Sequence, residues 1–164
     1  NGLVPLRNRV KNGWAQIDVQ LKQRADLIPN LVETVKGYAA HESQVFTQVT
    51  QARASALQAA QSGDVAQRIQ AENQLSRAIM NLQAVAEAYP QLQANQNFLD
   101  LQGQLKALEE KLAYARQFYN DVVQKYNTRI ETVPTNIIAS LFHFKQADHY
   151  QIAESDRAVP QVKF

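Results

Sequence analysis

Two glutamates, Glu42 and Glu72, interrupt stripes of apolar residues that repeat with the period of a helix. In some helical bundles, carboxylates at such positions bind a pair of iron ions, together with two Glu-x-x-His motifs. The Glu-x-x-His motif is absent, because none of the glutamates in the predicted helices is followed by a histidine three residues later. These glutamates are Glu33, Glu42, Glu72, Glu87, Glu109, Glu110 and Glu131. We therefore expect neither a metal site nor a bound cofactor.

The same carboxylates favour a structural layer of polar side chains in the interior of a bundle. A buried carboxylate without a partner is too unfavourable to keep, whereas a paired polar layer can fix the register of the helices. We expect this layer to consist of Asp18, Arg24, Glu42, Glu72, Asn73, Arg116 and Asn120. A metal- or ligand-binding groove built on Glu42 and Glu72 is the alternative.

Several other kinds of chemistry are excluded by what the chain does not contain. It has no cysteine, so it has no thiol nucleophile, thiolate metal site or disulfide. It has no Gly-rich phosphate loop and no nucleophile elbow. The 17 basic and 15 acidic residues are too evenly balanced for a nucleic-acid-binding surface. We expect a protein that is not an enzyme and does not bind nucleic acid.

Long helices must position the polar residues, because glycine and proline are scarce while good helix formers such as Ala and Gln are abundant. Apolar residues recur in alternating steps of three and four, which is the heptad pattern of bundles and coiled coils. The pattern predicts four helices, at residues 3–24, 27–60, 65–88 and 98–131, of which the second and fourth are long. Tyr119 and Tyr126 fall on the apolar stripe of the fourth, which favours core aromatics over the alternative of an aromatic-lined contact surface.

Pro29 decides where the first two helices divide. A proline deep inside a helix loses a backbone hydrogen bond and clashes with the preceding turn, at about 3 kcal/mol. In the first turn this effect nearly vanishes, and Asp26 is a suitable N-cap three residues earlier. We therefore predict that the first helix ends near Arg24 and that the second begins after Asp26.

Short links between these helices predict an antiparallel four-helix bundle over residues 1–134. Gly63 and Asp64 provide the turn between the second and third helices, as C-cap and N-cap. Residues 135–164 follow as a short apolar helix and an extended tail. Tyr150, among other apolar residues of this tail, favours a strap packed on the bundle within the same domain.

Several stretches closely resemble the LemA family of bacterial membrane-anchored proteins. The longest is "WAQIDVQLKQRADLIPNLVETVKGYAAHE" at residues 14–42. Others follow in the same order: "QAENQLSRAI", "AYPQLQANQNFLDLQGQL", "ARQFYNDVVQKYN", "PTNIIASLFHF" and "PQVKF". The resemblance implies a four-helix bundle without known enzymatic activity, and an N-terminal transmembrane anchor absent from this chain. It also implies a role in the cell envelope, since family members occur beside membrane zinc metalloproteases and one branch serves magnetosome membranes.

The beginning of the chain is basic, with Arg7, Arg9 and Lys11 close together. If an anchor precedes residue 1, these side chains lie just beyond the membrane and can bind anionic lipid head groups. The positive-inside tendency then favours a cytoplasmic domain. Relatives of the lipoprotein type would be periplasmic, so both sides of the membrane stay open.

The sequence as a whole favours a membrane-tethered helical interaction or scaffold module of the bacterial envelope. Its expected partners are the membrane, through the anchor, and other envelope proteins. The alternative is the ligand-binding bundle at Glu42 and Glu72.

Overall fold

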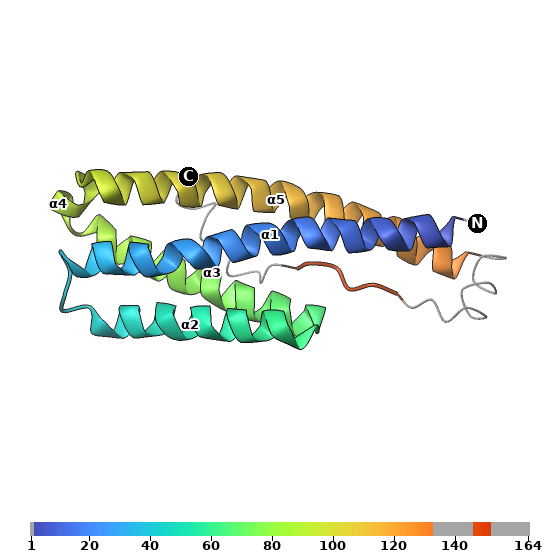
Figure 1. Ribbon diagram of the computed structural model, residues 1–164, viewed down its shortest axis with the longest axis horizontal. Coiled ribbons are helices and arrows are strands. Elements are labelled where there is room, and N and C mark those ends of the chain that lie inside the picture. Colours follow the sequence, from blue (N-terminus) through green and yellow to red (C-terminus); the bar gives the residue numbers. More distant parts are fainter. Residues whose placement is uncertain (1, 133–145, 152–164) are drawn as a thin grey trace. The chain divides into compact units, whose positions relative to one another are not determined.

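Helices make up most of the part of the chain that the structure describes. The structure is a computed structural model and describes residues 2–132 and 146–151 (Figure 1). The helices are α1 at Leu3–Lys36, α2 at Ser43–Ser62, α3 at Val65–Glu87, α4 at Pro90–Gln93 and α5 at Gln96–Glu131. The predicted all-α class is confirmed. The predicted short helix after residue 135 lies outside the described residues.

α1 is one uninterrupted helix with Pro29 in its interior, so the predicted boundary between Arg24 and Asp26 is wrong (Figure 1). Because proline has no N–H, the carbonyl of Ala25, four residues earlier, loses its partner within the helix. Arg53 of α2 donates a hydrogen bond from Nε to this carbonyl at 2.8 Å. Its guanidinium replaces the missing backbone donor, and this explains why the helix tolerates Pro29.

The break between the first two long helices lies later, at residues 37–42. α1 ends after Lys36, where Gly37 is a poor helix former and the amide of Ala39 donates to the carbonyl of Val35 at 2.9 Å. The predicted bounds of the second helix, residues 27–60, are therefore wrong, because about the first third of this range belongs to α1. The long helices are α1 with 34 residues and α5 with 36, whereas α2 and α3 have 20 and 23.

α2 and α3 form a helical hairpin through the two residues Gly63 and Asp64 (Figure 1). Gly63 has φ 75°, the left-handed conformation that glycine adopts without strain. The Asp64 carboxylate accepts hydrogen bonds from the amides of Ala66 and Gln67. Both predicted caps are confirmed.

α4 was not predicted. It is a single turn that begins at Pro90, where the missing N–H of proline leaves no helical acceptor unpaired. After it, the side chain of Asn95 accepts a hydrogen bond from the amide of Phe98 at 2.9 Å. This local cap starts α5 close to the predicted position.

The described residues fall into two compact units. Unit 1 comprises residues 2–21, 109–132 and 146–150, and unit 2 comprises residues 22–108 and 151. Both α1 and α5 contribute one part to each unit.

Each unit has an apolar core of its own. The core of unit 2 receives side chains from all five helices, among them Leu31, Val49, Leu75, Leu82, Leu92, Phe98 and Leu105. In unit 1, Leu3 and Tyr126 are buried together, with Leu6, Val10, Ile130 and Ala147 packed against them. These cores hold the helix faces that carry the polar residues.

The replacement of a backbone donor by Arg53 is testable with a double-mutant cycle. Arg53→Ala leaves the Ala25 carbonyl without its donor and should destabilise the chain by about 1–2 kcal/mol. In a Pro29→Ala background the amide of residue 29 can bond to this carbonyl, so the same substitution should have at most half that effect. Urea unfolding of the four proteins measures the coupling. Equal effects of Arg53→Ala in both backgrounds would contradict this role of Arg53.

Candidate functional site

Glu72 of α3 is buried and bonded to two arginines. Its Oε1 accepts a hydrogen bond from Arg24 Nη2 of α1 at 3.1 Å, and its Oε2 accepts from Arg68 Nε at 3.0 Å. The exposed fraction is 1% for Arg24 and 2% for Glu72. Arg24 also donates to Ser76 Oγ and to the backbone carbonyl of Glu72.

This arrangement explains why a carboxylate can stay in the interior. Each carboxylate oxygen has a guanidinium donor, and the partners lie on two helices, so the group ties α1 to α3. Arg68 is four residues before Glu72, which places both side chains on one face of α3. A carboxylate held in this way is suited to a structural role, because neither oxygen is directed at an open site.

Glu42 does not join this group. It lies in the turn before α2, where its side chain makes no capping hydrogen bond. Glu42 is 21 residues before Gly63, whereas Glu72 is 8 residues after Asp64. At about 1.5 Å per residue, the two carboxylates are roughly 20 Å apart along the hairpin. The structure therefore does not bring Glu42 and Glu72 together, either in one polar layer or in one binding site.

The other residues of the expected layer are also not one set. Asn73 belongs to unit 2, where its Nδ2 donates to the carbonyl of Gln151 at 3.0 Å. Asp18, Arg116 and Asn120 belong to unit 1. Of the seven predicted residues, the structure brings Arg24 and Glu72 together, and Arg68 completes the group although the sequence analysis omitted it.

Unit 1 contains a different polar arrangement, built around residues 146–150 of the strap, which we define as residues 146–151. Asn120 and Asn127 of α5 each bond to the backbone of the strap, at Tyr150 and Ala147. Arg116 lies over the ring of Tyr150, with 5.5 Å from its Cζ to the ring centroid. Asp18 is half-buried on α1. The strap is therefore the common partner of two predicted layer residues.

Tyr119 and Tyr126 are buried in unit 1, as predicted for core aromatics. The Tyr119 hydroxyl donates to the carbonyl of Asp148 at 3.0 Å. Burial, and to a smaller extent the charge of Asp148, raises the pKa of Tyr119 to about 12. Burial also raises the pKa of Tyr126, while the positive charge of Arg7 acts in the opposite direction. Both phenols thus stay protonated donors at neutral pH.

The basic residues at the start of α1 differ in exposure. Arg9 and Lys11 are exposed, whereas Arg7 is half-buried near Tyr126. Arg7 and Lys11 are four residues apart and share a face of the helix, and Arg9 points elsewhere. Their binding to lipid head groups stays a prediction.

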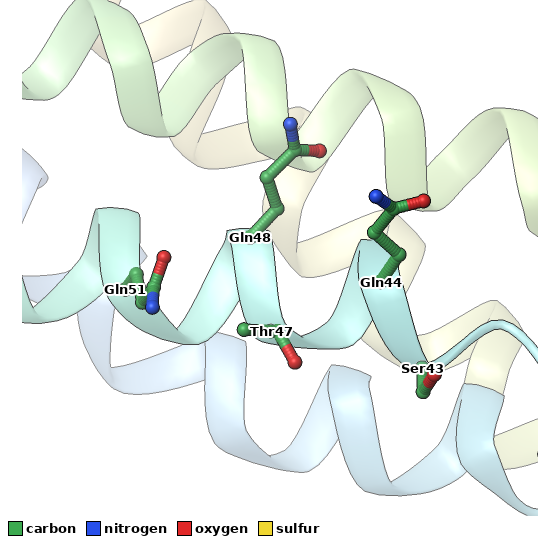
Figure 2. A pocket seen from close by; sticks show the side chains of 5 residues that line it. All are labelled: Ser43, Gln44, Thr47, Gln48 and Gln51. Carbon is green, nitrogen blue, oxygen red and sulfur yellow. The ribbon is translucent and has the colours of Figure 1, made fainter.

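The surface of α2 has a shallow, open depression of about 550 Å³ (Figure 2). Exposed polar side chains without charge line it: Ser43, Gln44, Thr47, Gln48 and Gln51. Gln44 and Gln48 project from the same side of the helix (Figure 2). Because the lining contains neither an acid nor a base, nothing in it can transfer a proton.

Residues 2–132 and 146–151 contain neither a metal-binding cluster nor a membrane-spanning helix. Within these ranges, no three His, Asp or Glu side chains come close enough to hold a metal ion. In the same ranges, no helix combines the length and apolarity needed to cross a bilayer.

Comparison with known proteins identifies relatives over nearly the whole chain. The sequence profile of the LemA family matches residues 13–164. Magnetosome protein MamQ 2 of Paramagnetospirillum magneticum is 24% identical over 174 residues, which cover 92% of this chain and 64% of the relative. Protein LemA of Metamycoplasma hominis is 23% identical over 159 residues, covering 96% of this chain and 71% of that protein. The chain thus spans less than two thirds of the length of the MamQ relative.

The role of Glu72 predicts a large difference between two glutamates. Glu72→Ala leaves two buried guanidiniums without their carboxylate and should destabilise the chain by about 3–5 kcal/mol. Glu42→Ala, in the turn, should change stability by no more than about 0.5 kcal/mol. Thermal and urea unfolding followed by circular dichroism compare the two. Similar small effects of both substitutions would show that the buried group is not needed for stability.

The raised pKa of Tyr119 predicts a pH dependence of stability. An unfolded tyrosine ionises near pH 10, but Tyr119 in the folded chain ionises near 12. Between these values the folded state keeps a proton that the unfolded state has lost, so the free energy of unfolding falls as pH rises. Tyr119→Phe should flatten this fall in urea unfolding between pH 10 and pH 12. Tyr114→Phe is the control, because Tyr114 is 78% exposed and should leave the slope unchanged.

Proposed function

Because this chain belongs to the LemA family, we propose that it is a membrane-tethered helical module that binds other proteins of the bacterial envelope. In this proposal the helices are a scaffold and carry out no reaction. LemA family proteins are not known as enzymes. The module acts by presenting side chains on its helices to a partner.

The observation that carries this proposal is that the buried carboxylate of Glu72 is bonded to two arginines. Among the described residues, the buried charged side chains are Arg24, Arg68 and Glu72, and they bond to one another. The apolar cores fill the interior around them. Interior chemistry has no free acid or base to work with in this region, so recognition at the surface is the better supported role.

An exposed aromatic pair on α5 supports a surface role. Tyr114 is 78% exposed, and Phe118, one turn later, is 36% exposed. Large aromatic side chains are enriched where proteins bind one another. The two residues therefore mark a face of unit 1 at which a partner would be sought first.

Tethering is supported by the resemblance to membrane-anchored family members and by relatives named as magnetosome proteins. These curated relatives are longer than the matched region. The exposed Arg9 and Lys11 would add attraction to anionic lipids near an N-terminal anchor. Electrostatic attraction is screened by salt, whereas a transmembrane anchor is not.

The proposal predicts a result for the full-length protein in its native membrane. The protein should stay in the membrane fraction after a wash in about 1 M salt. At this concentration the electrostatic screening length falls to about 3 Å. A photo-crosslinking residue at position 114 should give one reproducible crosslinked envelope protein. The same residue at the exposed position 51 of α2 serves as the control.

Each half of the proposal can fail separately. Release of the full-length protein by salt alone would reject the tether. Repeated absence of a crosslinked protein at position 114, or the same set of products at positions 114 and 51, would reject recognition through this face.

A further inference from the structure

The strap is bound to unit 1 through its backbone in a repeated way. At Ala147, the side chain of Asn127 donates from Nδ2 to the carbonyl at 3.0 Å and accepts from the amide at 2.8 Å. At Tyr150, the side chain of Asn120 makes the same two bonds, at 3.0 and 2.8 Å. Each asparagine amide thus recognises both polar groups of one residue of an extended chain.

The spacing of the two asparagines matches the geometry of an extended peptide. Asn120 and Asn127 are seven residues apart on α5, which is two helical turns and about 10.5 Å. Ala147 and Tyr150 are three residues apart in an extended segment, which spans about 10 Å. The strap runs antiparallel to α5, because Ala147 meets Asn127 and the later strap residue Tyr150 meets the earlier helix residue Asn120. This match requires no particular side chains on the bound peptide.

Between the two asparagines, a third contact also uses the backbone. The Tyr119 hydroxyl donates to the carbonyl of Asp148 at 3.0 Å. The side chains of Asp148 and His149 are exposed, so they are not selected by burial. Backbone recognition therefore extends over four residues of the strap.

One side chain of the strap is selected closely. Tyr150 is 4% exposed. Its ring lies 6.2 Å from the ring of Trp14 and 5.5 Å from the guanidinium carbon of Arg116. Trp14 is itself 5.5 Å from Tyr119, so an aromatic pocket is built from both helices of unit 1. At the other end Ala147, a small residue, is half-buried and packs against Leu3 and Tyr126.

We propose that this groove of unit 1 is a binding site for an extended segment of a partner protein, with a small residue followed three positions later by tyrosine. The strap is its tethered occupant and holds the site closed until a partner segment displaces it. The inference deepens the proposed function by naming the partner's chemistry, and it rests on that function for the partner being an envelope protein. The groove residues are Trp14, Arg116, Tyr119, Asn120 and Asn127.

A tethered occupant competes strongly with a free peptide. Because the strap belongs to the same chain as the groove, its binding is intramolecular, and for short linkers the effective concentration reaches the order of millimolar. A free peptide therefore needs a chain in which the strap has lost its anchor. Tyr150→Ala removes that anchor and leaves every groove residue in place.

The experiment titrates an N-acetylated, C-amidated peptide with the sequence Gln-Ala-Asp-His-Tyr-Gln into the chain carrying Tyr150→Ala. Trp14 is the only tryptophan of the chain, so its fluorescence reports occupation of the pocket. We expect a saturable change, with binding at least tenfold tighter than to the wild-type chain. Adding Asn120→Ala should weaken binding at least tenfold, whereas Asn81→Ala, an exposed asparagine of α3, should not change it.

Three results would overturn the proposal: no saturable change, equal binding of a peptide with alanine in place of tyrosine, or unchanged affinity after Asn120→Ala. If Tyr150→Ala abolishes the helical circular dichroism signal, amide hydrogen exchange of the wild-type chain decides instead. Peptide at about 10 mM, above the effective concentration of the tether, should then speed exchange at Ala147 and Tyr150 severalfold. Unchanged exchange would also overturn it.

One further outcome is distinguished by the same samples. A dimer of the wild-type chain in size-exclusion chromatography that the peptide dissociates would assign the groove to the strap of a second copy, against a partner protein. The measurements use purified chain without a membrane. Their failure would therefore remove this site while leaving the membrane-wash and crosslinking results of the proposed function to stand separately.

Discussion

The hydrogen bond from Arg53 to the carbonyl of Ala25 is the contact on which the course of the chain depends. It supplies the donor that Pro29 lacks and so allows α1 to continue to Lys36. Because α1 continues, its first part can belong to unit 1 while its last part enters the core of unit 2. The same contact joins α1 to α2. Pro29 would interrupt an isolated helix, but here α2 supplies the missing hydrogen-bond donor. The same helix contributes Arg24 to the buried group at Glu72 and Trp14 to the pocket around Tyr150.

The sequence predicts well those features that depend on neighbours in the chain. Gly63 and Asp64 act as caps because of their own conformational and hydrogen-bonding preferences, and the all-α class follows from composition and periodicity. The division of the first two helices was wrong because it depends on Arg53, which is 24 residues beyond Pro29. The spacing of three and four also continues across residues 37–42, where the structure has a turn, although Gly37 and Ser43 are residue types that mark the end and the start of a helix.

The candidate site shows the same limit. The pairing of Arg24 with Glu72 follows from the need to neutralise a buried carboxylate, and Arg68 could have been added from its spacing of four residues. By contrast, nothing local to Asn120 and Asn127 shows that they bind a backbone. Their role depends on a segment that follows them by 20 or more residues and adopts an extended conformation. Tyr119 was placed correctly in the core, but its hydroxyl partner also comes from this segment.

The turn at Gly63 and Asp64 has a consequence for the order of folding. It joins α2 and α3 directly, so many contacts of unit 2 connect residues that are close in sequence and can form quickly. Unit 1 instead brings residues before 22 together with residues after 108. Its assembly must close a long loop, which carries a larger entropic cost. The two segments of unit 1 therefore meet late in folding, after the hairpin of α2 and α3 has formed.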